Sequence, residues 1–308
     1  LGLRRPGRIS DGRQNAPRLD ESKLRAALLE RVGTDLELTH SQSSAVEQLR
    51  ARAARAKLRD VPEGLLQRCC IAADNDVDEA YTRLRDIVRW RESQGVQHIL
   101  EDPEALAAEK WYRDLLQYSI PGRDKRGRSV MIEAIGQWDM DALDKAARES
   151  KEAMLRAHVV VCERLLSQAQ EAASERSEEQ QQHGHGGGRA AGAHARVPGF
   201  VAVLDMEGIS LRQNPLAYPQ LLGALREVSK INARYYPEAV EHVFVVNAPR
   251  LFQSIWSTLA PFVLPSSGVK VDVLPRGDYS TLVRECGEIC LPKQLGGKLP
   301  AHTPPYKA

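Results

Sequence analysis

The chain has 308 residues, of which 42% are hydrophobic, so it is long enough to bury a sizeable core in one large domain or two smaller ones. Its formal net charge of +2 gives no overall field for a nucleic acid partner, and no stretch approaches the ~20 apolar residues of a membrane span. The five cysteines form no C-x-x-C pair, and Cys286 and Cys290 have no second ligand pair nearby. We therefore expect reduced thiols, no metal site and a cytoplasmic location.

The first 110 residues divide into a polar tail and a helical segment. Residues 1–20 carry arginines among Gly, Pro and Asn, which predicts a disordered basic tail that is either solvated or in contact with an anionic membrane surface. From 21 to 110 the apolar residues recur at helical spacing, and Asp76 followed by Glu79 is an N-cap signature. We therefore expect a small helical N-terminal lobe.

Beyond Trp111 the pattern changes to short, nearly continuous apolar runs that alternate with helical segments. Strands that are apolar on both faces belong to sheets covered by helices on both sides. The alternation therefore predicts an α/β domain over 111–299 with a mostly parallel sheet flanked by helices, followed by a tail at 300–308. The expected strands are 129–135, 200–206, 242–247 and 269–274, and the expected helices are 141–168, 215–235 and 251–263.

Residues 169–198 interrupt this pattern with a run of Ser, Glu and Gln and then several glycines, which predicts a disordered insertion between a helix and a strand. His185 and the glycines after it match the oxyanion loop of some esterases and, loosely, a dinucleotide fingerprint. However, the chain has no G-x-S-x-G nucleophile elbow, and no buried strand precedes these glycines. His183, His185 and His194 could chelate a metal weakly, but a solvated tract is the better interpretation.

Asp205 and Glu207 end a predicted buried strand, and the carboxyl ends of parallel strands are where α/β proteins place ligand sites. Two carboxylates there could perform acid–base chemistry, as in a hydrolase. Alternatively, they cap the following loop. No nucleophile, histidine or metal ligand stands beside them in the sequence, so we favour the structural role.

The segment 251–263 carries large apolar side chains at helical spacing: Leu251, Phe252, Ile255, Trp256, Leu259 and Phe262. One interpretation is a helix packed in the core, and the other is a helix that covers an apolar cavity and swings aside. Lys270 opens the next predicted strand. It is either a solvated edge charge or, beside such a cavity, a fixed cation for a phosphate.

Several short motifs occur in order along residues 60–298. They are Asp76-Val77, Trp90-Arg91, D-K-R-G-R-S-V from Asp124, L-D-M-E-G-I-S from Leu204, Y-Y-P-E from Tyr235, F-V-V-N-A-P from Phe244 and L-P-K-Q-L-G-G from Leu291. In this order and at this spacing they resemble the signature of CRAL-TRIO lipid-binding domains, and most of all those of the phosphatidylinositol transfer proteins. The resemblance is interrupted by the predicted insertion.

The resemblance implies a helical lobe followed by a sheet and helices that enclose an apolar lipid pocket. It implies no enzyme activity and no cofactor. The protein would bind one phospholipid, with phosphatidylinositol as the leading ligand, and transfer or present it between membranes that it touches transiently, as a monomer. A binder of another hydrophobic ligand, a lipid-regulated scaffold and, less favoured, a hydrolase are the alternatives.

The resemblance also implies site residues. Lys270, Glu238 and Ser267 align with contacts of an inositol phosphate headgroup, and Asp124 aligns with a residue near it. These types suit the task, since lysine supplies a point charge to phosphate, a serine hydroxyl can donate, and carboxylates accept from ring hydroxyls. The expected pocket and gate residues are Phe252, Ile255, Trp256, Leu259, Phe262, Phe200 and Ala202.

Two departures from the family pattern bear on the ligand. The basic pair that precedes D-V in the family is here Ala73-Asp74, which removes one source of positive charge for a headgroup. The Ser and Thr that hold choline lipids in the family fall at Phe200 and Ala202. Phosphatidylcholine is therefore not expected to bind through the usual contacts.

Overall fold

The computed structural model describes residues 37–182, 195–210, 215–249, 269–301 and 305. The chain divides into the unit Leu1–Asp35, which lies outside these residues, and the unit Leu36–Ala308, which contains the described fold. The helices are α2 (His40–Arg55), α3 (Glu63–Ala72), α4 (Val77–Ser93), η1 (Val96–His98), α5 (Pro103–Leu116), η2 (Ile135–Gln137), α6 (Met140–Glu149), α7 (Lys151–Gln182), η4 (Pro215–Ala217), α8 (Pro219–Tyr235), α10 (Ser280–Cys286) and η5 (Lys293–Leu295). The strands are β1 (Tyr118–Arg123), β2 (Ser129–Glu133), β3 (Phe200–Asp205), β4 (Val240–Val246) and β5 (Lys270–Val273).

The predicted helical lobe consists of α2, α3 and α4, whose apolar faces share one buried cluster that includes Leu49, Leu84 and Ile87. Asp76 caps α4 by accepting hydrogen bonds from the backbone N–H groups of Asp78 and Glu79, at 2.9 and 3.0 Å, which confirms the predicted N-cap. The predicted boundary at 110 falls inside α5, and α5 packs along α7.

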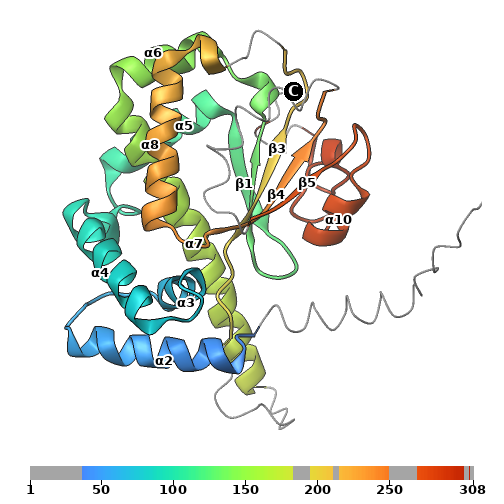
Figure 1. Cartoon of the computed structure of the whole chain (residues 1–308). Coiled ribbons are helices and arrows are strands. Elements are labelled where there is room, and N and C mark those ends of the chain that lie inside the picture. The colour runs from blue at the N-terminus through green and yellow to red at the C-terminus, as the bar shows by residue number, and fades with distance from the viewer. Residues whose placement is uncertain (1–36, 183–194, 211–214, 250–268, 302–304, 306–308) are drawn as a thin grey trace, which may run out of the picture. The chain divides into compact units, whose positions relative to one another are not determined.

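The sheet has the strand order β1-β2-β3-β4-β5, with β1 antiparallel to β2 and the remaining pairs parallel (Figure 1). The mostly parallel α/β fold predicted from the sequence is confirmed. β1 was not predicted, because Pro121 and Gly122 weaken its strand pattern. Proline is tolerated there because β1 is an edge strand, and the register shifts between Ser119 and Gly122.

Both faces of the sheet are covered, as the continuous apolar strands predicted. Along β3, Phe200, Ala202 and Leu204 join the cluster formed with α5, α6, α7 and α8. The alternate residues Val201 and Val203 join a second cluster with α10. Figure 1 shows α7 and α8 on one side of the strands and α10 on the other. Among the described residues, no helix is both long and apolar enough to cross a membrane.

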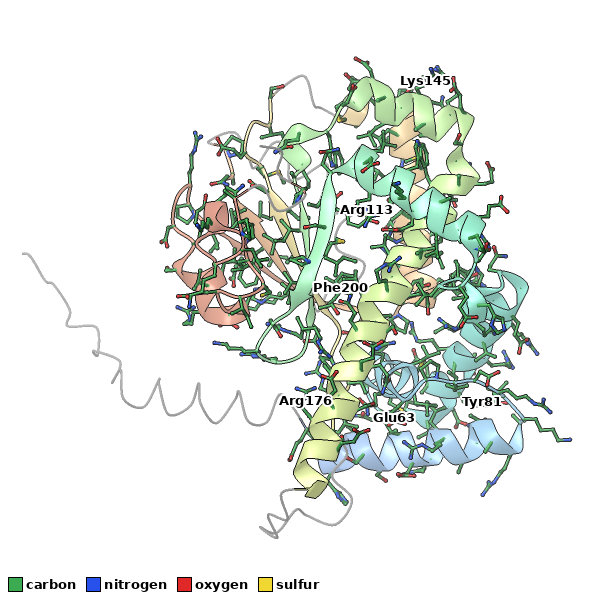
Figure 2. The ribbon with its side chains drawn as sticks, turned by 180° about the vertical axis from the view of Figure 1, so that it is seen from behind. Glu63, Tyr81, Arg113, Lys145, Arg176 and Phe200 are labelled. Atoms are coloured by element: carbon green, nitrogen blue, oxygen red, sulfur yellow. The ribbon has the colours of Figure 1, made fainter. Side chains whose placement is uncertain are left out.

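The prediction of a disordered insertion over 169–198 is wrong at both ends. Near the C-terminal end, Val197 is buried and donates its N–H to Gln67 Oε1 at 2.8 Å. Residues 169–182 continue α7, and Ala169, Ala172 and Ala173 form a narrow buried stripe at helical spacing. Arg176, which Figure 2 places on this helix, donates from Nη1 to the carbonyl of Arg126 in the β1–β2 turn at 2.7 Å. The composition misled because Ala, Glu and Gln are strong helix formers, and alanine supplies a packing face without bulk.

The other helix predictions have mixed outcomes. The helix predicted over 141–168 is two helices, α6 and α7, separated at Ser150, where φ is −143°. The helix predicted over 215–235 is a turn of η4 followed by α8. The gate helix predicted over 251–263, Ser267 and residues 183–194 lie outside the described residues.

Candidate functional site: an apolar cavity on the sheet

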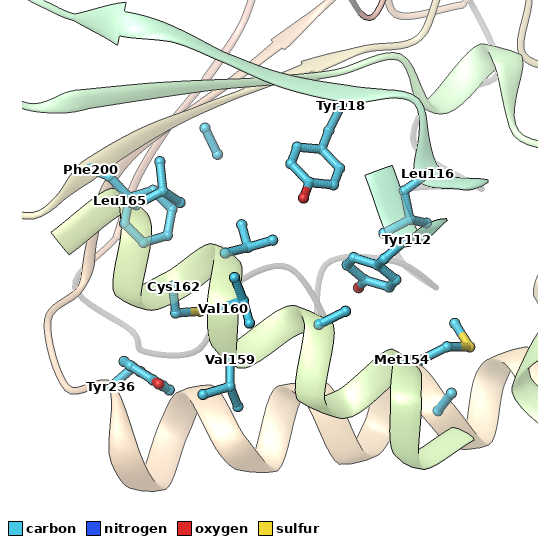
Figure 3. Packing of buried hydrophobic residues seen from close by; sticks show 14 of the residues in the cluster. Tyr112, Leu116, Tyr118, Met154, Val159, Val160, Cys162, Leu165, Phe200 and Tyr236 are labelled. Atoms are coloured by element: carbon cyan, nitrogen blue, oxygen red, sulfur yellow. The ribbon is translucent and has the colours of Figure 1, made fainter. Parts of the chain in front are cut away.

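An apolar cavity lies between one face of the sheet and the helices that cover it. Its volume is about 140 Å³, and about 980 Å³ when all the space between its lining atoms and its open mouth is included. In Figure 3, Tyr118 and Phe200 project from the strands toward Val160, Cys162 and Leu165 on α7. The described lining residues are Tyr112, Leu116, Tyr118, Met131, Glu133, Ile135, Trp138, His158, Val161, Cys162, Leu165, Phe200, Ala202, Leu204, Leu225, Val228, Asn232 and Val240.

The two-residue repeat of the strands produces the cavity floor. Phe200, Ala202 and Leu204 lie on this face of β3, and Met131 and Glu133 occupy the matching positions of β2, paired in register with Ala202 and Leu204. Phe200 and Ala202 thus line the cavity, whereas the expected gate residues Phe252, Ile255, Trp256, Leu259 and Phe262 fall in the segment outside the described residues.

The polar groups in the cavity are held in uncharged forms. Burial raises the pKa of Glu133 to about 8, so its carboxyl is mostly protonated at neutral pH. Burial lowers the pKa of His158, although the hydrogen bond between its Nε2 and Asn232 Oδ1 at 2.7 Å partly opposes this shift. Burial also raises the pKa of the Cys162 thiol, which therefore is not a nucleophile at neutral pH. No lysine or arginine is among the described lining residues. The lining suits apolar chains or a neutral polar group.

Asp205 and Glu207 act as structural groups at the carboxyl end of β3. Asp205 Oδ1 accepts hydrogen bonds from the backbone N–H of Glu207 at 2.9 Å and from Asn247 Nδ2 at 2.8 Å. Tyr279 in turn donates its hydroxyl proton to Asn247 Oδ1 at 2.8 Å, and Glu207 pairs with Arg276. These contacts agree with the favoured capping role rather than with acid–base chemistry.

The expected headgroup residues lie outside the described lining of the cavity. Lys270 pairs in register with His242, and its Nζ lies 3.2 Å from Asp272 Oδ2. His242 lies two residues before Phe244 in β4, and Asp272 pairs in register with Phe244. Phe244 packs in the cluster with α10, so Lys270, which alternates with Val271 and shares the face of Asp272, points to that side of the sheet. Val271 packs on the cavity side. Asp124 is buried and accepts hydrogen bonds from the backbone N–H groups of Arg126 and Arg128.

Asp124 and Lys270 instead belong to two neighbouring groups of charged residues, one around Arg128 and one around Asp272. Asp124 Oδ2 accepts from Arg128 Nε at 2.7 Å, and Arg128 Nη1 lies 3.8 Å from Glu241 Oε2. Burial, followed by the charges of Lys270 and Arg128, lowers the pKa of His242 to about 4, although the hydrogen bond to Asp272 partly opposes this shift. Glu241 and His242 were not predicted as site residues. The signal that could have found them is that each is a polar residue on a largely apolar strand, β4. Glu238 adopts a left-handed conformation, with φ of 48°.

A mostly parallel sheet and covering helices around an apolar cavity define the chain as an α/β protein with an internal hydrophobic site. The profile of the CRAL/TRIO domain matches residues 115–297. The chain therefore belongs to the CRAL/TRIO domain family, which confirms the resemblance found in the sequence.

Proteins of similar sequence align with most of the chain. The SEC14 cytosolic factor of Candida glabrata is 27% identical over 270 residues, which cover 86% of this chain and 81% of that protein. The SEC14 cytosolic factor of Eremothecium gossypii is 27% identical over 271 residues, which cover 87% of this chain and 80% of that protein. The phosphatidylinositol/phosphatidylcholine transfer protein SFH14 of Arabidopsis thaliana is 26% identical over 222 residues, which cover 72% of this chain and 35% of that longer protein.

Among solved structures, that of Sfh5 aligns with a TM-score of 0.50 and 16% sequence identity, covering 85% of this chain and 88% of Sfh5. At this level of identity the likeness concerns the fold alone.

Proposed function

We propose that the chain binds one phospholipid in the apolar cavity and transfers or presents it between membranes without catalysing a reaction. The observation that carries this proposal is the cavity itself, whose floor and walls are formed almost wholly by aliphatic and aromatic side chains. Shielding acyl chains from water contributes about 0.8 kcal/mol per CH₂, so a loaded lipid would leave only at a membrane surface. The family and the names of the similar transfer proteins support the same conclusion.

Loading a phospholipid requires the cavity to widen. Its volume of about 140 Å³ is smaller than the roughly 300 Å³ of the smallest pockets that hold drug-sized ligands. We assign this opening to the segment 251–263, with Phe252, Ile255, Trp256, Leu259 and Phe262 as its apolar gate. The proposal rests on the spacing of these side chains in the sequence.

Phosphatidylinositol is our leading ligand, with Lys270, Glu238 and Ser267 as headgroup contacts. Asp124, whose carboxylate already accepts from Arg126 and Arg128, would lie near the headgroup without binding it. Because these residues are outside the described lining, the headgroup would sit outside the cavity that holds the acyl chains. Lys270 is 59% exposed, and an exposed ion pair such as Lys270–Asp272 contributes ~1 kcal/mol at most, so its ammonium can turn to a phosphate at little cost. Phe200 and Ala202 offer no hydroxyl to a choline headgroup, which argues against phosphatidylcholine.

A second candidate is a neutral hydrophobic ligand with one hydroxyl or carbonyl group. It is favoured by the protonated Glu133 carboxyl, which makes no hydrogen bond or ion pair with the described residues and lines the cavity beside Tyr112. In either case we propose a monomer that acts in the cytoplasm and visits membranes transiently, as the name cytosolic factor of two relatives suggests.

The deciding experiment extracts the lipid from protein purified under native conditions and identifies it by mass spectrometry. The same protein is then tested for transfer of labelled phosphatidylinositol between vesicles, with chromatography of the recovered lipid. We expect bound phosphatidylinositol, transfer, and a lipid recovered intact. Protein that carries no lipid and transfers none would refute the proposal, and a neutral lipid alone would favour the second candidate.

A further inference from the structure

A second cavity, of about 240 Å³, lies where the helical lobe meets α7 and the end of α8. Figure 1 shows α3 next to α7, and the two helices are in contact. Its described lining consists of Pro62, Leu65, Arg68, Arg91, Leu100, Glu163, Leu166, Ser167, Gln170, Glu171, Tyr235 and Tyr236. None of the expected headgroup residues is among them, and no residue is shared with the apolar cavity.

Arg68 is the unusual residue in this cavity. It is 7% exposed, and its guanidinium makes no hydrogen bond or ion pair with any described residue. Burial lowers its pKa to about 10, which still leaves it charged at neutral pH. A buried charge without a partner is strongly unfavourable. By contrast, Arg128, which is similarly buried, is paired with Asp124 at 2.7 Å.

The nearby carboxylate does not serve as the missing partner of Arg68. Glu163 binds both Nη atoms of Arg91, at 2.6 and 2.9 Å, and also accepts from the Tyr236 hydroxyl at 2.9 Å. Its charge and lone pairs are therefore already engaged. Glu171, the other carboxylate in the lining, is exposed, so water screens its charge. Among the described lining residues, Arg68 is therefore the buried charged group that has no partner.

Gln170 adds a second donor beside Arg68. Its Oε1 accepts from the backbone N–H of Gly64 at 3.1 Å, which fixes the amide so that Nε2 is the end left to donate. Nε2 makes no hydrogen bond with the described residues. Arg68 Nη1 approaches the same stretch of α3, since a Cβ added to Gly64 would lie 2.8 Å from it. The guanidinium and the amide thus come from two elements that meet at Gly64.

We propose that this second cavity is an anion-binding site that takes a phosphate group, with Arg68 as the main donor and Gln170 Nε2 as an additional one. A guanidinium matches phosphate geometry, and the volume has room for a group of several water-sized atoms. The phosphate can belong to a lipid headgroup at the protein surface or to a free inositol phosphate. The site does not depend on lipid occupying the apolar cavity.

The test is calorimetric titration of the full chain with inorganic phosphate and with myo-inositol 1-phosphate, at constant ionic strength set with sodium chloride. We expect saturable binding of one anion per chain. Arg68→Gln should weaken it on the order of tenfold or more, because a charged hydrogen bond is lost. Gln170→Glu, which keeps an acceptor for Gly64 N–H but repels anions, should weaken it similarly. Arg55→Gln, at an exposed position on α2, is the matched control and should bind like the parent.

Thermal melting provides an independent readout that a structural role for Arg68 would not reproduce. Without phosphate, Arg68→Gln should melt at or above the parent, because it removes an unpaired buried charge. With phosphate, the parent should rise and the variant should not. A variant that melts well below the parent in the absence of phosphate would overturn the proposal, as would a parent that binds neither anion or an Arg68→Gln variant that binds them equally.

A vesicle transfer assay distinguishes the two possible sources of the phosphate, a lipid headgroup and a free anion. If Arg68→Gln also loses transfer of phosphatidylinositol, the lipid headgroup supplies the phosphate; if transfer is unchanged while inositol phosphate binding falls, a free anion does. A protein that carries no lipid but still binds phosphate through Arg68 would refute the proposed function and leave this site standing.

Discussion

The indole ring of Trp90 stacks on the ring of Tyr235, with their centroids 4.1 Å apart and their planes at 6° to each other. The contact joins α4 of the helical lobe to the last residue of α8, so it ties the lobe to the helices that cover the sheet. Tyr236 adds an edge-on contact to the same indole, at 6.0 Å.

Replacing this indole should loosen the lobe. We expect Trp90→Ala to lower the free energy of unfolding by about 3 kcal/mol, measured by urea denaturation, because a large packed aromatic is lost. Trp111→Ala is the control, since Trp111 is 36% exposed, and it should cost less than half as much. Equal losses for the two variants would contradict a special role for the stack.

Glu133 should make stability fall as the pH rises. Burial raises the pKa of its carboxyl from 4.5 to about 8 in the folded chain. Between these values the unfolded chain binds fewer protons than the folded one, so each increase in pH favours unfolding. At pH 8 we expect Glu133→Gln to exceed the parent in unfolding free energy by ~1 kcal/mol or more, with little difference near pH 4.5.

The control is Glu178→Gln, at an exposed position of α7, which should stay within about 0.5 kcal/mol of the parent. His158, whose pKa is lowered by burial, adds a loss of stability on acidification that the parent and both variants share. A constant difference between Glu133→Gln and the parent from pH 5 to 8 would show that Glu133 does not titrate in this range.

Lys270 should select the anionic headgroup without supporting the fold. Lys270→Ala is expected to slow phosphatidylinositol transfer on the order of tenfold, because one charged hydrogen bond is worth roughly 1.5–3 kcal/mol. Its stability should stay within about 0.5 kcal/mol of the parent, since the lysine is 59% exposed. Lys230→Ala, which removes a 71% exposed lysine paired with Glu227, is the matched control in the transfer assay. Equal transfer by the two variants would place headgroup recognition elsewhere.

The two halves of the segment 169–198 should respond differently to change. Replacing residues 183–194 with a shorter Gly-Ser linker should leave the melting temperature almost unchanged, because loop closure costs only about 0.6 kcal/mol per doubling of length. Ala169→Glu, in the part of α7 that is buried, should lower the unfolding free energy by several kcal/mol, since it places a charge at a position with no exposure. A large loss of stability from the linker replacement would show that residues 183–194 pack on the domain.

Periodicity predicted the elements whose burial follows a simple repeat. The four parallel strands and the Asp76 cap were found because each depends on neighbours in sequence. β1 was missed because Pro121 and Gly122 are tolerated only through its place at the sheet edge, and the end of α7 was missed because its packing face is alanine. Such features depend on tertiary position, which composition does not record.

The candidate site was predictable to a similar extent. Strand alternation puts Phe200 and Ala202 on one face, and the same rule separates Lys270 from Val271, so the orientation of the lysine was implicit in its position along β5. The isolation of Arg68 could not be read from the sequence, because it depends on Glu163 being occupied by Arg91 and Tyr236, which come from distant segments.

The two edges of the described sheet also bear on how copies of this chain behave at high concentration. β1 carries Pro121, which has no N–H to offer, and a register irregularity at Gly122. β5 has only four residues and places Lys270 and Asp272 on one of its faces. Short, charged or proline-bearing edges are poor templates for a strand from another molecule. Both edges of the described sheet thus disfavour edge-to-edge aggregation. This property would help to keep copies of a protein with a large apolar core apart in solution.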